Sequence, residues 1–175
     1  MGDGKLREAG ERRGERRAEG MHSWVLLVYK VAPEPSARRV YVWRKLKRLG
    51  ALLLHDAIWV LPATPYTREQ LRWLAAEIEE LEGSAQVWDA HPSLAAHDEE
   101  LVRRFLAQIE AAYREIMAEL ERPGADAAAL SKRYQQVQQQ DYFHSALGAK
   151  IREALASANE VGEIGNSAEE GGGKA

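Results

Sequence analysis

The stretch from Trp24 to Pro62 constrains the fold of this chain more than any other, because it predicts a strand, a helix and a hairpin in direct succession. Its first part, Trp24 to Val31, is a run of β-branched, aromatic and other apolar residues, which is typical of a strand at the centre of a sheet. Ser36 follows as a candidate helix N-cap, and Gly50 is a candidate C-terminal stop. The helix between them is expected to bury an apolar stripe made of Val40, Trp43, Leu46 and Leu49.

Two short apolar runs, Ala51 to Leu54 and Ile58 to Leu61, predict an antiparallel hairpin. A second helix is expected from Thr67, which has Gln70 at the capping-box spacing, and a last strand is expected over Ser84 to Ala90. The order is strand, helix, strand, strand, helix, strand. We therefore expect an α+β fold, a ferredoxin-like βαββαβ sandwich with two helices on one face of a four-stranded sheet.

Strand signals end after Ser93, and the rest of the chain has the spacing of helices, broken at Pro123-Gly124. We expect a long helix of about seven turns, a shorter second helix, and a last helix for which Asp141 is the candidate cap. Together they predict a C-terminal helical hairpin or bundle. The apolar positions are Leu101, Phe105, Ile109, Ala112, Ile116 and Leu120, then Leu130, Tyr134 and Val137, then Leu147, Ile151 and Leu155.

These patterns divide the chain into four parts. We expect a disordered N-terminal extension over residues 1–21, the ferredoxin-like domain over 22–92, a helical appendage packed on it over 93–158, and a disordered tail over 159–175. The two outer parts are polar and rich in Gly and Glu, with almost nothing to bury. Met21 directly precedes the first strand, so translation could begin there instead of at Met1.

The composition excludes several classes of protein. The chain has no cysteine, which excludes disulfides, thiolate zinc sites and cysteine nucleophiles. Its longest apolar runs are far shorter than the roughly 20 residues that span a bilayer, so we expect a cytoplasmic protein without a membrane partner. The first residues lack the apolar core of a secretory signal.

Charge is unevenly distributed, although the net charge is only -3. No acidic residue lies between Ser36 and Gly50, whereas four glutamates lie between residues 77 and 82. Clustered Arg and Lys side chains suit an anion, either the phosphate backbone of DNA or an oxyanion such as chromate. A solvated outer helix face is the alternative interpretation. The candidate binding residues are Arg38, Arg39, Arg44, Lys45, Lys47 and Arg48, with His55 in the adjoining hairpin.

No pattern indicates catalysis. The chain shows no Gly-rich phosphate loop, no Ser-His-Asp order and no paired carboxylates, and His55, His91 and His97 lack the spacing of metal ligands. We therefore expect no enzyme activity, no metal site and no cofactor. Most tryptophans are expected in the core, but Trp73 lies off the apolar stripe of its helix and should be partly exposed.

Several short motifs resemble the N-terminal domain of the ChrB chromate-resistance proteins, over about residues 22 to 158. They are Arg38-Arg39-Val40, Val42-Trp43-Arg44, Leu49-Gly50, Ile58-Trp59-Val60-Leu61-Pro62 and Asp141-Tyr142-Phe143. Some members of that family are regarded as chromate-responsive transcription regulators. The resemblance therefore implies a regulatory or accessory role in the response to chromate, with DNA, chromate or a separate ChrB C-terminal domain protein as candidate partners.

The element order is also similar to the central domain of PaaX-type repressors and to the ferredoxin-like nucleases of CRISPR adaptation. Those nucleases carry an Asp at the end of the first strand as a metal ligand, whereas this chain has Lys30 there. A cation does not ligate a hard divalent metal, so we expect neither nuclease nor chromate-transforming activity. The alternative function is a protein interaction or homodimerisation module without nucleic-acid binding, using a sheet edge or the long helix with Leu101, Phe105 and Ile109.

Overall fold

The computed structural model describes residues 20–170, with side chains described as far as residue 158. It divides into two compact units between Leu101 and Val102. The expectation for residues 1–21 lies almost wholly outside the described residues, and so does the end of the expected tail from residue 171. The boundary differs from the expected one at residues 92 and 93 because the first turns of the long helix belong with the sheet.

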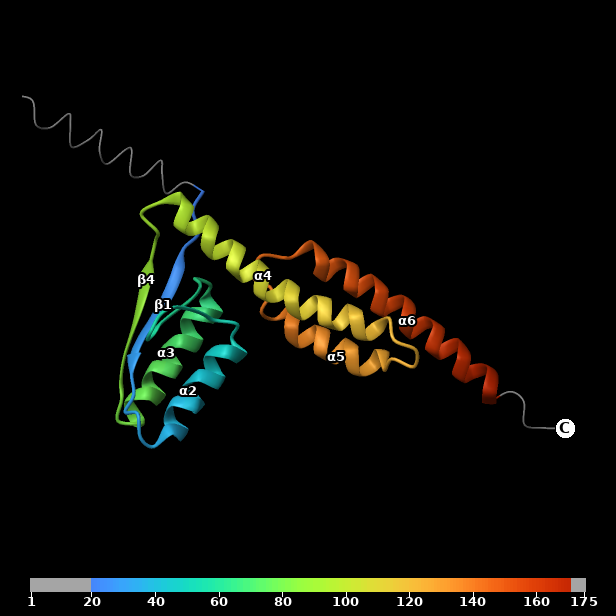
Figure 1. Cartoon of the computed structure of the whole chain (residues 1–175), viewed down its shortest axis with the longest axis horizontal. Helices are drawn as coiled ribbons and strands as arrows, with labels where there is room; N and C mark the ends of the chain where they lie inside the picture. The colour runs from blue at the N-terminus through green and yellow to red at the C-terminus, as the bar shows by residue number, and fades with distance from the viewer. Residues whose placement is uncertain (1–19, 171–175) are drawn as a thin grey trace, which may run out of the picture. The chain divides into compact units, whose positions relative to one another are not determined.

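The first unit contains the predicted βαββαβ order. Its elements are β1 (Trp24–Lys30), α2 (Ser36–Arg48), β2 (Leu52–His55), β3 (Ile58–Pro62), α3 (Pro65–Glu80) and β4 (Ser84–Ala90). The sheet order is β2-β3-β1-β4 and every pair is antiparallel, which confirms the ferredoxin-like α+β fold. Figure 1 shows α2 and α3 side by side on one face of this sheet.

Strand β1 lies at the centre of the sheet, as predicted, between β3 and β4. Val25 pairs with Leu61 and Leu27 pairs with Trp59, and both β1 residues are fully buried. Side chains alternate between the faces of a strand, so Tyr29 shares the helix-covered face with Val25 and Leu27. This alternation places a polar hydroxyl beneath α2.

The apolar stripe predicted for α2 is wrong in its register. The buried residues are Val42 and Leu46, whereas Val40 and Trp43 are 42% and 50% exposed. Residues 42, 46 and 49 share one face of a helix because they are four and seven positions apart. Val40 and Trp43 lie to one side of that face and do not reach the core.

Helix α3 begins three residues earlier than predicted. The N-cap is Thr64, whose hydroxyl accepts from Thr67 N at 3.1 Å, while Thr67 Oγ1 accepts from Thr64 N at 2.9 Å. Pro65 occupies the first turn, where a missing N–H costs nothing. The buried face is confirmed at Leu71, Leu74 and Ile78.

The second unit consists of helices, as predicted, and the chain breaks between them at Pro123-Gly124. They are α4 (Ala95–Leu120), whose first turns belong to the first unit, α5 (Ala127–Gln138) and α6 (Ala146–Glu170). Asp141 accepts from Ser145 N at 3.0 Å at the start of α6. The backbone of α6 continues to Glu170, so a helix occupies residues 159–170 where the composition predicted a tail. Their shared core is Ile109, Tyr113, Ile116, Leu130, Tyr134, Ile151 and Leu155.

Among the described residues, no helix is both long enough and apolar enough to cross a membrane. The same residues contain no group of three or more side chains that could hold a metal ion.

Candidate anion-binding site on helix α2

Two of the six candidate cations on α2 are held by acidic groups at α3. Arg38 Nη1 donates to Glu82 Oε2 at 2.8 Å and to the carbonyl of Leu81 at 2.9 Å. Lys45 Nζ donates to both carboxylate oxygens of Glu77, at 2.6 and 2.7 Å, and the Glu77 partner is the main cause of a raised pKa at Lys45. These two side chains mainly join the helices.

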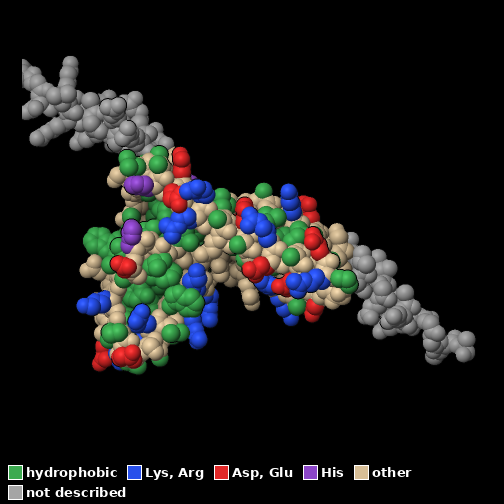
Figure 2. All heavy atoms as spheres, viewed as in Figure 1, with side chains coloured by type: hydrophobic (Ala, Val, Ile, Leu, Met, Phe, Trp, Pro, Cys, Tyr) green, Lys and Arg blue, Asp and Glu red, His purple; other side chains and the backbone are tan. Residues whose placement is uncertain are grey.

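The other side of α2 keeps its cations in solvent. Arg44 and Lys47 are exposed, and they form no hydrogen bond or ion pair within the described part of the chain. They lie three positions apart and therefore on neighbouring positions of one face. Figure 2 shows Lys and Arg side chains gathered along the outer edge of this helix. Arg48 is exposed at the end of the same helix.

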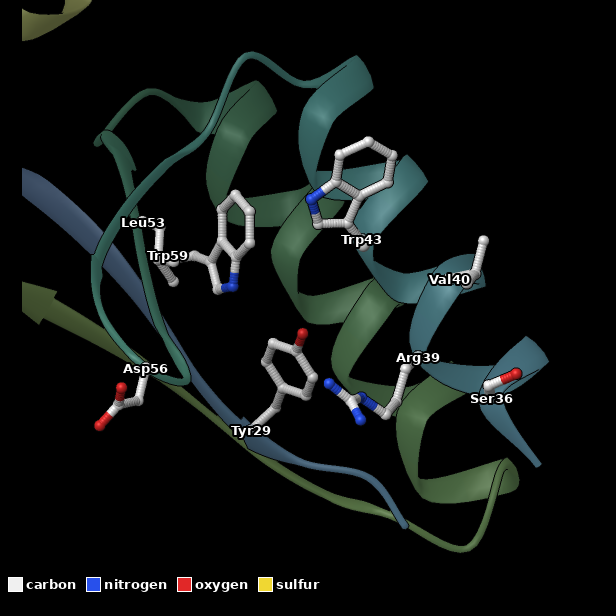
Figure 3. Close-up of a pocket in the computed structure, with 8 residues that line it drawn as sticks. All are labelled: Tyr29, Ser36, Arg39, Val40, Trp43, Leu53, Asp56 and Trp59. Atoms are coloured by element: carbon white, nitrogen blue, oxygen red, sulfur yellow. The ribbon is translucent and has the colours of Figure 1, made fainter. Parts of the chain in front are cut away.

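A cavity of about 490 Å³ lies between α2 and the β2–β3 hairpin (Figure 3). It exists because α2 packs onto the sheet through Val42 and Leu46, which leaves the side of Val40 and Trp43 standing away from β3. Arg39 lines the cavity from α2, so it is separate from the outer cations. The lining residues are Tyr29, Ser36, Arg39, Val40, Trp43, Leu53, Asp56 and Trp59.

Three hydrogen-bond donors lie around this cavity. Figure 3 shows the Tyr29 hydroxyl, the Trp59 indole N–H and the Arg39 guanidinium near the same space, with the Asp56 carboxylate pointing away from it. Burial raises the pKa of the Tyr29 hydroxyl, and the Trp59 N–H and the Arg39 charge offset part of that shift. Tyr29 therefore stays protonated at neutral pH and can donate.

The indole N–H of Trp59 acts on the Tyr29 hydroxyl, whose pKa it lowers, but does not reach standard hydrogen-bond geometry. The residue is only 5% exposed, and its Nε1 has no hydrogen-bond partner of standard geometry among the described residues. It points toward the Tyr29 hydroxyl (Figure 3). A buried N–H without an acceptor in standard geometry is uncommon in folded proteins, so this position requires an explanation.

The remaining predicted positions lie elsewhere. His55 is exposed at the end of β2 and does not line the cavity, although Leu53 and Asp56 beside it do. Lys30 is exposed at the end of β1, paired with Ser84 of β4. The predicted cations therefore fall into three groups. Arg38 and Lys45 are paired with groups at α3, and Arg39 lines the cavity. Arg44, Lys47 and Arg48 are exposed on the outer side of α2.

The aromatic part of the cavity consists of Tyr29, Trp43 and Trp59, and none of the three is among the predicted site residues. Only Tyr29 carried a usable signal, because it is a polar residue at an inward position of an otherwise apolar strand. Trp43 and Trp88 were expected in the core, but they are 50% and 56% exposed. The partial exposure predicted for Trp73 is confirmed, at 62%.

The fold and the site define a class of protein: a ferredoxin-like α+β domain that carries a cationic helix and is followed by packed helices. Residues 39–127 match the family described as Protein ChrB, N-terminal, so the chain belongs to this family. The resemblance seen in the motifs is therefore confirmed.

One relative is Protein ChrB of Cupriavidus metallidurans (strain ATCC 43123 / DSM 2839 / NBRC 102507 / CH34). It is 34% identical over 98 residues, which is 56% of this chain. The match covers 30% of the length of that protein. No solved structure matches the chain.

Proposed function

We propose that this chain is a non-enzymatic regulatory or accessory protein of chromate resistance that binds duplex DNA through the outer side of α2. Membership of the ChrB N-terminal family supports the chromate context. The observation that carries the binding mode is the pair Arg44 and Lys47, which stand in solvent on a helix without any acidic side chain. Such a protein would act in the cytoplasm, where the DNA is.

Phosphate contacts make DNA binding depend on salt, because each neutralised phosphate releases counterions. The expected result for the double variant Arg44→Ala, Lys47→Ala is weaker binding and a logarithmic salt slope that is shallower by about 2. The measurement is fluorescence anisotropy with a labelled duplex from the promoter region of the gene, at several salt concentrations.

A matched control removes the same charge from other surfaces. Arg72 on α3 and Arg152 on α6 are both exposed. The variant Arg72→Ala, Arg152→Ala should keep the wild-type salt slope. Equal slopes in all three proteins would exclude the outer side of α2 as the DNA contact. Chromate added to the complex would show whether an oxyanion competes for the same cations.

The alternative is a protein interaction module, and exposed aromatic side chains favour it. Trp73 on α3 and Trp88 on β4 are 62% and 56% exposed. Trp88 pairs with Leu26, on the sheet face opposite to the one that α3 covers, so the two indoles are separate candidate contact points. Candidate partners are a second copy of the chain and a separate ChrB C-terminal domain protein. Sedimentation velocity with and without duplex DNA separates the two functions, since this module would self-associate and ignore DNA.

The absence of catalysis belongs to the same proposal. Lys30 stands at the end of β1, where a nuclease of this fold would need a carboxylate to hold a divalent metal. Incubation with Mg²⁺ or Mn²⁺ and labelled nucleic acid should give no cleavage, and chromate should be recovered unchanged. A metal-dependent nuclease activity that copurifies with the chain would refute this part of the proposal. The same activity should then also be present in a Lys30→Ala variant.

A further inference from the structure

The cavity between α2 and the hairpin presents donors without a matching acceptor. Arg39 and the Trp59 indole can only donate hydrogen bonds, and Tyr29 donates through its hydroxyl. The single carboxylate on the rim, Asp56, points away from the space (Figure 3). A ligand that fits this arrangement must bring acceptor atoms, and the positive charge of Arg39 favours an anion.

The Trp59 N–H faces the Tyr29 hydroxyl and lowers its pKa, although the two groups lack standard hydrogen-bond geometry. A ligand oxygen that accepts from the Tyr29 hydroxyl would turn the hydroxyl proton toward the cavity. The lone pairs of the Tyr29 oxygen would then face Trp59 Nε1, which has no partner of standard geometry among the described residues. A ligand oxygen would therefore accept from Tyr29 while the Tyr29 oxygen stays available to the Trp59 N–H.

The other walls of the cavity are apolar. Val40, Trp43 and Leu53 line it and are 42%, 50% and 41% exposed. A bare oxyanion would leave these side chains in water, whereas an organic group would cover them. The volume of about 490 Å³ also lies in the range of sites for small organic ligands.

We propose that this cavity binds a small aromatic carboxylate, with the carboxylate at Arg39 and Tyr29 and the ring between Trp43 and Trp59. Planar rings stack on indole faces, and these two indoles come from opposite sides of the cavity, α2 and β3 (Figure 3). The inference goes beyond the proposed function, because it concerns neither DNA nor the outer cations of α2.

The test is an NMR titration of the full chain with 2-naphthoate, observed at the indole N–H signals. The sequence has five tryptophans, and five Trp→Phe variants assign their signals. The Trp43 and Trp59 signals should shift in a saturable manner through ring currents. The signals of Trp73 and Trp88, which lie outside the cavity, should stay in place.

Matched variants and probes define the ligand class. Arg39→Gln should weaken naphthoate binding about tenfold or more, because it removes a charge-assisted hydrogen bond. Arg44→Gln, five residues further along α2 and outside the cavity, should leave naphthoate binding unchanged. The neutral analogue 2-naphthalenemethanol should bind about tenfold more weakly than the carboxylate. Circular dichroism verifies that each variant is folded.

Several results would overturn the proposal. One is the absence of a saturable shift of the Trp43 and Trp59 signals. Another is a loss of naphthoate affinity in Arg44→Gln as large as in Arg39→Gln. A third is an affinity for 2-naphthalenemethanol equal to that for 2-naphthoate. Displacement of naphthoate by chromate or phosphate at lower concentration would make this a site for bare oxyanions instead. The DNA experiment depends on Arg44 and Lys47, whereas the naphthoate experiment depends on Arg39. A negative result in either experiment therefore leaves the other proposal unaffected.

Discussion

At the scale of single residues, Asp98 joins the start of β1 to the first turn of α4. Its carboxylate accepts from the backbone N of His22 at 3.2 Å, from His22 Nδ1 at 2.9 Å and from Trp24 Nε1 at 2.7 Å. The side chain is only 7% exposed. Burial acts to raise the pKa of Asp98, but the hydrogen bonds from His22 and Trp24 outweigh it and hold the pKa below its ordinary value.

A lowered pKa in the folded state predicts a loss of stability in acid. The contribution is fully present above the unfolded pKa of about 4, and it is lost as pH falls through the lower folded value. Asp98→Asn should lower the free energy of unfolding by about 1–3 kcal/mol at pH 7. The difference in this free energy between the variant and the wild type should become smaller below pH about 4. Urea unfolding at a series of pH values measures both the loss of stability at pH 7 and its change with pH.

The control for this series is Glu99→Gln, which removes a charge from the exposed neighbour of Asp98. It should leave the free energy of unfolding nearly unchanged at every pH. A gap between Asp98→Asn and the wild type that stays constant down to pH about 2 would contradict the assigned role of the carboxylate.

Gly148 on α6 is required by a close contact with Tyr113. A Cβ atom at this position would lie 2.9 Å from both Cε2 and Oη of the tyrosine, whose side chain is fully buried. The hydroxyl of Tyr113 donates to Asp141 at 3.1 Å, so a displaced ring would also lose this bond. The glycine therefore serves packing and not a turn.

Gly148→Ala should destabilise the chain by about 1–3 kcal/mol through overpacking, although alanine is the better helix former. Thermal unfolding followed by circular dichroism gives the change. Lys150→Ala, on an exposed position of the same helix, is the control and should have little effect. A Gly148→Ala protein more stable than the wild type would show that Tyr113 moves aside at no cost.

At the scale of elements, two ion pairs join α2 to α3 and to Glu82 just beyond its end. The Lys45–Glu77 pair lies at 2.6 Å, with side chains 36% and 31% exposed, and the Lys45 ammonium also lies 5.0 Å from the centre of the Tyr41 ring. Arg38 joins the C-terminal end of α3 through Glu82. The acidic residues of α3 thus complement the basic helix.

A double-mutant cycle of Lys45→Ala and Glu77→Ala should give a coupling energy of about 0.5–1 kcal/mol, because partial exposure screens the pair. The coupling should fall when NaCl is raised to about 1 M. Urea unfolding of the four proteins provides the energies. The pair Arg44 and Glu79, both exposed, is the control and should show no coupling. A salt-independent coupling would mean that packing, not charge, joins the helices.

The elements themselves could be predicted from the sequence, but the faces of α2 could not. Residues 40, 43, 46 and 49 form one spacing pattern, and residues 42, 46 and 49 form another. The two patterns share Leu46 and Leu49, and only packing against the sheet selects Val42 over Trp43. Likewise, Thr64 and Thr67 are both candidate caps in the sequence, and the hydrogen bonds show that Thr64 is the cap and Thr67 lies in the first turn of α3.

At the scale of the whole molecule, each unit has its own markers. All five tryptophans lie between residues 24 and 88, in the first unit. The core formed by α4, α5 and α6 draws its buried members from residues 109 to 155. Tryptophan fluorescence therefore reports on the first unit, and most of the helical ellipticity comes from the second.

Ile116→Ala should remove about 2–5 kcal/mol from the stability of the second unit, because Ile116 is fully buried in its core. The unfolding midpoint from far-ultraviolet circular dichroism should fall, and the midpoint from tryptophan fluorescence should move less. Leu74→Ala, in the core of the first unit, should lower the midpoint from tryptophan fluorescence more than the midpoint from circular dichroism. Equal shifts of both signals in both variants would mean that the chain unfolds as one cooperative system.

The candidate site shows why the sequence predicted only part of it. The cavity takes Tyr29 from β1, Trp43 from α2 and Trp59 from β3, and the sheet order brings these segments together. The charge run on α2 was visible in the sequence, but the pairing of Arg38 and Lys45 with α3 was not. Local spacing predicts elements, whereas a cavity depends on how far a helix stands from the sheet.

The position of α2 above the hairpin also offers an experimental advantage. Ser36 and Asp56 lie on opposite sides of the cavity, and the chain contains no cysteine. Cysteines introduced at these two positions would be its only thiols, so a pair of nitroxide labels could be attached without side reactions. The distribution of distances between the labels would then record directly whether α2 moves relative to the hairpin as the solution conditions change.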